Sequence, residues 1–97
     1  MAILDDVKVA LRIAASNTTF DGEIGDLIEA AKDDLQLAGI TSDDTTDPLI
    51  KRAVITYCKA HFGYDNPDAD RFIKSYEMLK MHLTLAEDYT DGGGGVS

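Results

Sequence analysis

The stretch Asp47–Asn66, DPLIKRAVITYCKAHFGYDN, decides the fold that this chain is expected to adopt. Asp47 is a favourable N-cap and Pro48 suits the first helical position, whereas Gly63 suits the end of a helix. Apolar side chains fall on most sides of the intervening helix: Leu49, Ile50, Ala53, Val54, Ile55, Tyr57, Cys58 and Phe62. Because a helix that is apolar on most sides usually lies inside its bundle, we predict that this segment is the central helix.

The same stretch holds the only cysteine, Cys58, and one of two histidines, His61, on one helical face. A Cys–His nucleophile also needs an orienting group and an oxyanion hole, and zinc needs four ligands or three plus water. The other histidine, His82, belongs to a different predicted helix. We therefore interpret Cys58 as a residue that packs in the core, and His61 as one whose hydrogen bonds are satisfied or that lies at the edge of the core. We predict no catalytic, cofactor-binding or metal-binding residues.

Two acidic loops, TSDDTTD (41–47) and DNPDAD (65–70), have the composition of cation sites. An EF-hand loop needs a glycine at its sixth position and a glutamate at its twelfth, and neither stretch supplies that glycine. Helix capping and the helix dipole explain the same acids, so we favour those roles.

Apolar residues at helical spacing also predict helices over about residues 3–14, 21–38 and 67–87. Asp21 is the expected N-cap of the second, Gly39 with Ile40 should close it as a Schellman motif, and Asn66-Pro67 should begin the last. Four consecutive glycines follow Tyr89. We predict an all-α fold, a small antiparallel bundle of four main helices in one domain (1–89), with a flexible Gly-rich tail (90–97).

The 97 residues include 18 acidic and 9 basic ones, a net charge of −9. Such a chain should neither wrap DNA nor sit on an anionic membrane, since phosphate contacts need Lys or Arg. The excess of acidic residues either keeps the protein soluble or forms a surface that repels nucleic acid. A single cysteine, no signal-peptide pattern and no long apolar run predict a protein kept in a cytoplasm-like environment, with no membrane span.

Two patterns in the chain have the forms L-x-x-V-K-x-x-L-R-I and D-x-x-I-x-x-L-I-x-x-A. A third stretch, P-L-I-K-R-A-V (48–54) followed by an aromatic residue, is similar to the form P-x-x-I/L-K-x-A-I/V with one residue fewer after the proline. In this order they resemble the small head–tail connector (adaptor) proteins of long-tailed bacteriophages. The resemblance covers about residues 3–66 and leaves 67–89 as one more helix, and the loop AASNTTFDG is longer than in many relatives. The matching residues are Leu4, Val7, Lys8, Leu11, Arg12, Ile13, Asp21, Ile24, Leu27, Ile28, Ala31, Pro48, Leu49 or Ile50, Lys51, Ala53, Val54 and Phe62.

The resemblance implies a structural protein without enzymatic activity or cofactor. Such connectors form rings of about a dozen subunits below the portal protein after DNA packaging. The ring extends the DNA channel, through which DNA passes without specific binding, and docks a stopper or tail-completion protein. The expected location is the head–tail junction of the virion, assembled in the bacterial host cytoplasm. Contacts would involve the first loop and the chain end, here Asn17, Thr18, Thr19, Phe20, Glu87, Asp88, Tyr89, Thr90 and Asp91.

Two alternatives from other classes stay open on the sequence. The first is an acidic helical module that binds a protein partner, as a regulator or DNA mimic. The second is a small enzyme that uses Cys58 or His61. Against the enzyme, we expect Cys58→Ala to cost only stability, about 1–3 kcal/mol in the unfolding free energy, as denaturation would measure.

Overall fold

The structure is a computed structural model that describes residues 3–42, 44–63, 66–86 and 89. Its helices are α1 (Ile3–Ala10), α2 (Asp21–Leu37), α3 (Pro48–His61) and α4 (Ala69–Leu85). Within these ranges the chain forms no strand beyond an isolated bridge at Ile40. The predicted all-α fold is therefore confirmed, whereas the predicted tail, 90–97, lies outside the described residues. No helix in the described ranges is long and apolar enough to cross a membrane.

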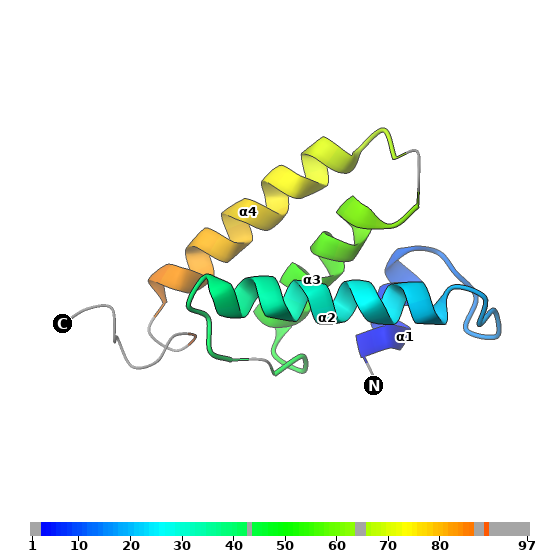
Figure 1. The fold of residues 1–97 in the computed structure, drawn as a ribbon, viewed down its shortest axis with the longest axis horizontal. Helices are drawn as coiled ribbons and strands as arrows, with labels where there is room; N and C mark the ends of the chain where they lie inside the picture. Colours follow the sequence, from blue (N-terminus) through cyan, green and yellow to red (C-terminus); the bar gives the residue numbers. More distant parts are fainter. Residues whose placement is uncertain (1–2, 43, 64–65, 87–88, 90–97) are drawn as a thin grey trace.

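Helix α3 is the centre of the molecule, as its apolar sequence predicted. It packs against α1, α2 and α4, and α1 also contacts α2. α3 and α4 run antiparallel as neighbours, α2 crosses α3, and the short α1 lies near the start of α2 (Figure 1). The ends of α2 and α4 meet at one end of the bundle (Figure 1).

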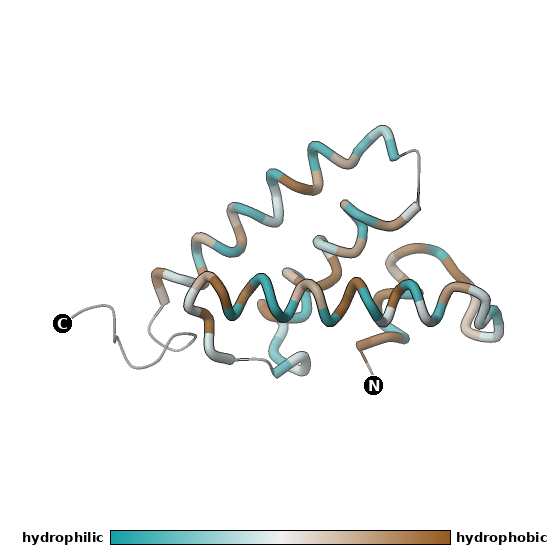
Figure 2. Tube along the Cα trace, viewed as in Figure 1, coloured by the Kyte–Doolittle hydropathy of each residue, from teal (hydrophilic) through white to brown (hydrophobic). Residues whose placement is uncertain are grey.

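The core is a single cluster of apolar side chains to which all four helices contribute. Along α2, apolar and polar positions alternate with the helical turn, so that one side is apolar (Figure 2). Removing this surface from water drives the association of the helices, because none of them would be stable alone. The buried residues are Val7, Ile24, Ile28, Ala31, Leu35, Ile40, Ile50, Ala53, Val54, Cys58, Tyr76 and Leu83.

Two helix ends follow the sequence signals closely. The Asp47 carboxylate accepts hydrogen bonds from the backbone N–H groups of Leu49 (2.8 Å) and Ile50 (3.4 Å), which caps α3. At the end of α2, Gly39 has a φ of 97° and the Ile40 N–H donates to the Leu35 carbonyl at 3.0 Å. This is the predicted Schellman motif, and it buries Ile40 completely.

Two helix starts differ from the prediction. Phe20, not Asp21, occupies the N-cap position of α2 and makes no side-chain capping bond. Asp21 is instead the first residue of the helix, and its carboxylate pairs with Lys8 of α1 at 2.8 Å. The α4 helix begins only at Ala69, because the Asn66 side chain first forms a turn by accepting from the Asp68 N–H at 3.0 Å.

Helix α1 ends at Ala10, four residues earlier than its apolar pattern predicted. The Ile13 N–H donates to the Lys8 carbonyl at 2.8 Å, and the Arg12 N–H donates to the Val9 carbonyl at 3.0 Å. Arg12 lies between these bonds with a φ of 62°, the left-handed position that glycine usually takes at a helix end. Arg12 therefore holds a strained backbone conformation.

We expect Arg12→Gly to raise the free energy of unfolding by about 0.5–1 kcal/mol. Glycine removes the left-handed penalty of about 1–2 kcal/mol, although the added freedom of the unfolded chain offsets part of this gain. Chemical denaturation measures the difference. Arg12→Ala is the control, since alanine removes the same side chain but keeps the strain. If alanine stabilises as much as glycine, the backbone explanation is wrong.

Candidate functional site

The structure places Cys58 and His61 in different environments. Cys58 is completely buried in the core cluster, and burial raises the pKa of its thiol to about 12. A thiol in that state is neither a ready nucleophile nor a metal ligand. His61 is exposed, and its ring lies against that of Tyr57 with centroids 4.3 Å apart. The interpretation of Cys58 as core packing is therefore confirmed. The part of the chain that the structure describes contains no cluster of three or more His, Cys, Asp or Glu residues suited to a metal ion.

The acidic loops use their side chains to shape turns and helix starts. Asp44 accepts from the Thr46 N–H at 3.0 Å and from the Thr46 hydroxyl at 2.5 Å. Asp47 caps α3, as described above. Asn66 accepts from Asp68 and also donates to the Lys59 carbonyl at 2.6 Å, which joins the loop to α3. These bonds agree with the capping role that the sequence favoured.

A polar cluster joins the end of α2 to α4. The Tyr76 hydroxyl donates to the Asp34 carboxylate at 2.6 Å, and the Lys80 ammonium lies 2.9 Å from the same oxygen. Burial alone would raise the pKa of Asp34, but the bonds from Tyr76 and Lys80 outweigh it, so that pKa lies below its ordinary value. Burial, followed by the bond to Asp34, raises the pKa of the Tyr76 phenol. The cluster therefore holds α4 to α2 most strongly when Asp34 is ionised.

This cluster should make stability depend on acid. Because the pKa of Asp34 is lower when folded, its contribution is present above the unfolded value, near pH 4, and is lost as the pH falls below it. We expect Asp34→Asn to cost about 1 kcal/mol at neutral pH, a figure reduced for its partial exposure, and almost nothing in strong acid. Denaturation curves at several pH values measure this. A difference between the two proteins that does not change with pH would contradict it.

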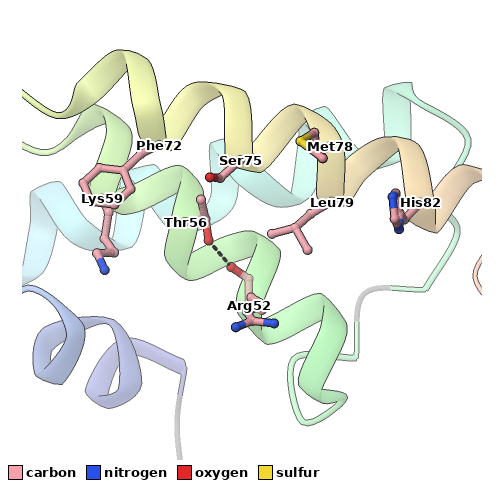
Figure 3. Close-up of a pocket in the computed structure, with 8 residues that line it drawn as sticks. All are labelled: Arg52, Thr56, Lys59, Phe72, Ser75, Met78, Leu79 and His82. Carbon is pink, nitrogen blue, oxygen red and sulfur yellow. Dashed lines mark hydrogen bonds between the residues drawn. The ribbon is translucent and has the colours of Figure 1, made fainter.

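An open groove of about 450 Å³ lies between α3 and α4. Arg52, Thr56 and Lys59 line it from α3, one helical turn apart, and Phe72, Ser75, Met78, Leu79 and His82 line it from α4 (Figure 3). The Lys59 ammonium lies 4.8 Å from the centre of the Phe72 ring, a cation–π contact. A smaller depression continues along α3 and shares Arg52, Thr56 and Lys59. The groove is thus basic along α3, while its α4 wall is mostly apolar and also carries Ser75 and His82.

The charge of α3 is opposite to that of the chain as a whole. Residues 48–63 contain Lys51, Arg52 and Lys59 and none of the eighteen acidic residues. Lys51 pairs with Asp6 at 3.5 Å, but neither Arg52 nor Lys59 forms an ion pair with any other described residue. Sequence reasoning missed this face because it weighed the net charge of the chain. The absence of acids from 48–63 was the signal that could have revealed it.

The interface residues expected in the first loop lie on the surface. Asn17, Thr18, Thr19 and Phe20 are exposed, and Asn17 shapes the loop by accepting from the Thr19 N–H at 3.1 Å. Phe20 is partly covered by the ring of Phe62, with centroids 5.5 Å apart in an edge-on arrangement. The loop is therefore available for contacts, while its aromatic residue is fixed against the end of α3.

Tyr89 is the one described residue of the second predicted contact segment, and it is half-buried within its own chain. Its hydroxyl donates to the Asp47 carboxylate at 3.0–3.1 Å, and its carbonyl accepts from the Thr41 N–H at 2.8 Å. The chain beyond α4 is thereby attached to the start of α3. Glu87, Asp88, Thr90 and Asp91 lie outside the described residues.

Comparison with known proteins gives one match. The model of a family described as phage connector protein matches residues 3–90. The match includes the segment 67–89, for which the sequence patterns indicated only a further helix. No curated protein and no solved structure matches the chain.

Proposed function

Since the chain belongs to the phage connector protein family, we propose that it is a ring-forming subunit at the head–tail junction. The family has a structural role in the phage particle. In the proposal, a ring of about a dozen copies sits below the portal protein and extends the DNA channel. It then receives a stopper or tail-completion protein, with assembly in the bacterial host cytoplasm.

The observation that carries the proposal is the family match over residues 3–90, which spans all four helices. The surface supports it. Leu37 and Leu85 are 88% and 78% exposed, and they end the two helices that meet at one end of the bundle (Figure 1). Met81, one turn before Leu85, is exposed as well. A small domain that leaves large apolar side chains uncovered at one end gains stability when another subunit covers them.

The acidic character suits a channel for DNA. A ring of chains with a net charge of −9 each repels phosphate over distances of about the Debye length, roughly 8–10 Å at physiological salt. DNA could then slide past without forming contacts that have to be broken. The proposal therefore includes passage of DNA without specific binding.

The experiment is to determine the mass of the full chain in solution, alone and with the portal protein of its phage, and to image both samples by electron microscopy. The expected result is closed rings, either in the free protein or on the portal. A species that stays strictly monomeric under both conditions would exclude the proposed function.

A second candidate function is an acidic module that binds a DNA-binding protein in place of DNA. The exposed acids Glu23, Asp26, Glu29 and Asp33 on α2 favour it. Recovery of a DNA-binding protein by the purified chain, together with a failure to bind portal, would favour this candidate.

A further inference from the structure

The groove between α3 and α4 is a surface prepared for an acidic, partly apolar partner. Arg52 and Lys59 supply positive charge that no described acid of the chain neutralises. Phe72, Met78 and Leu79 supply apolar surface on the opposite wall (Figure 3). From Arg52 to Lys59 the basic edge extends about 11 Å at the helical rise of 1.5 Å per residue.

The chain itself carries a surface of the opposite sign on α2. Glu23, Asp26, Glu29 and Asp33 are all exposed and recur every three or four residues, which places them along one side of the helix. Of these four, only Glu29 forms an ion pair with another described residue, Lys32 at 3.5 Å. We refer to these four residues as the acidic stripe. It extends about 15 Å, similar to the basic edge of the groove.

The two surfaces lie on opposite sides of the molecule. The apolar side of α2, which includes Ile24, Ile28 and Leu35, faces the core, so the acidic stripe points away from it. In the view into the groove, α3 and α4 stand in front and α2 passes behind them (Figure 3). One molecule therefore cannot bring its own stripe to its own groove, whereas two molecules can. Complementary patches on different sides of a molecule make a head-to-tail contact, which closes into a ring when the rotation between successive subunits allows it.

We propose that the groove between α3 and α4 binds the acidic stripe of α2 from a second copy of this chain, and that this is the repeating contact of the ring. The inference rests on the proposed ring-forming function and specifies its interface. Arg52 and Lys59 of one copy would lie against Asp26 and Glu29 of the next. Charge pairing would set the direction and register of the contact, and the apolar wall would contribute most of the affinity.

A second copy fits this groove better than DNA does. DNA binding relies on many phosphate contacts from Lys and Arg, yet the described part of α3 offers only Lys51, Arg52 and Lys59. Lys51 is already paired with Asp6, and Arg71, which lies over the Phe72 ring, is paired with Asp68. The other wall is apolar, which suits a protein surface. The remainder of the chain is acidic and would repel a duplex.

The test uses charge reversal in the full chain. One variant reverses the groove, Arg52→Glu with Lys59→Glu, and a second reverses the stripe, Asp26→Lys with Glu29→Lys. A third combines all four changes and has the net charge of the original protein. The control, Arg12→Glu with Lys74→Glu, changes the net charge as the groove variant does but at exposed sites outside the groove. Circular dichroism verifies that each variant folds.

Self-association is measured by sedimentation over a range of concentrations. Each single-face variant should associate at least about tenfold more weakly, because two attractive pairs become repulsive. The combined variant should return to within a few-fold of the original protein, and the control should stay close to it. Restoration by the combined variant is the decisive result, since general loss of stability could not produce it.

Four results would overturn the inference. If the original protein forms rings and the groove variant forms them equally well, the interface is elsewhere and the proposed function stands. If the combined variant is as weak as the single-face variants, the two surfaces do not meet. If the groove variant loses retention of duplex DNA at low salt while its association is unchanged, the groove faces DNA. If the original protein is monomeric both alone and with the portal protein, no ring forms and the proposed function is wrong as well.

Discussion

Replacing Asp21 by asparagine is expected to lower the free energy of unfolding by about 2–4 kcal/mol. The cause is the burial of Lys8, whose side chain is only 4% exposed. Its ammonium lies 2.8 Å from Asp21 and 3.2 Å from the Ala15 carbonyl, so it ties α1 to the first loop and to the start of α2. Without Asp21, a buried positive charge keeps only a neutral partner, which is among the costliest changes a small domain can undergo.

The reverse substitution supplies the control. Lys8→Met removes the charge together with its desolvation cost and leaves an apolar side chain of similar length. The Asp21 side chain then keeps part of its water contact, because it is 31% exposed, although its Oδ1 is buried. We therefore expect Lys8→Met to cost clearly less than Asp21→Asn, about 1 kcal/mol. Chemical denaturation followed by circular dichroism measures both variants. Equal losses, or a larger loss for Lys8→Met, would show that the pair acts by attraction and not through the burial of Lys8.

The same pair shows why part of the fold could not be predicted. A lysine on a helix is normally solvated, and an aspartate before a helix is normally its cap, so the local pattern assigned Asp21 to capping. The actual role depends on α1 and α2 meeting at an end that only the tertiary structure defines. The connector patterns nevertheless contain both residues, Lys8 in the first and Asp21 in the second. Their pairing gives a physical reason for that part of the resemblance.

Features set by neighbouring residues could be predicted correctly. The Asp47 cap and the Schellman motif at Gly39 each depend on side chains within one or two turns, and the central position of α3 is indicated by apolar residues along the whole helix. The early end of α1 could not, because Arg12 adopts a backbone conformation that its residue type disfavours. There, the contacts of the loop after α1, including the hydrogen bond from Lys8 to Ala15, outweigh the preference of arginine for a right-handed backbone.

The candidate interface also has a part that the sequence predicts and a part that only the fold reveals. The spacing of Arg52, Thr56 and Lys59 on one helical face can be read from the sequence. That Phe72 and Leu79 of α4 form the opposite wall depends on how α4 packs against α3, and no local signal fixes that pairing. The helical spacing of the acidic stripe of α2 can likewise be read from the sequence. Its position behind the groove, on which the head-to-tail contact depends, follows only from the fold.

Ile50→Ala is expected to lower the free energy of unfolding by about 2–5 kcal/mol, against less than about 1 kcal/mol for Leu49→Ala. The two residues are adjacent in the first turn of α3, but Ile50 is completely buried and Leu49 is 44% exposed. The comparison therefore holds the helix and the type of substitution constant while burial changes. Denaturation at low protein concentration measures both losses, and similar values would mean that α3 is not central to the core.

The Ile50→Ala variant also connects folding with assembly. Natural domains are stable by only about 5–15 kcal/mol, so a loss of this size would leave a noticeable unfolded fraction in the free chain. If the ring forms, subunit association stabilises the folded state by mass action. The unfolding midpoint of Ile50→Ala should then rise with protein concentration. Adding the groove reversal at Arg52 and Lys59 should abolish that rise. A midpoint independent of concentration in Ile50→Ala itself would contradict the coupling of folding to self-association.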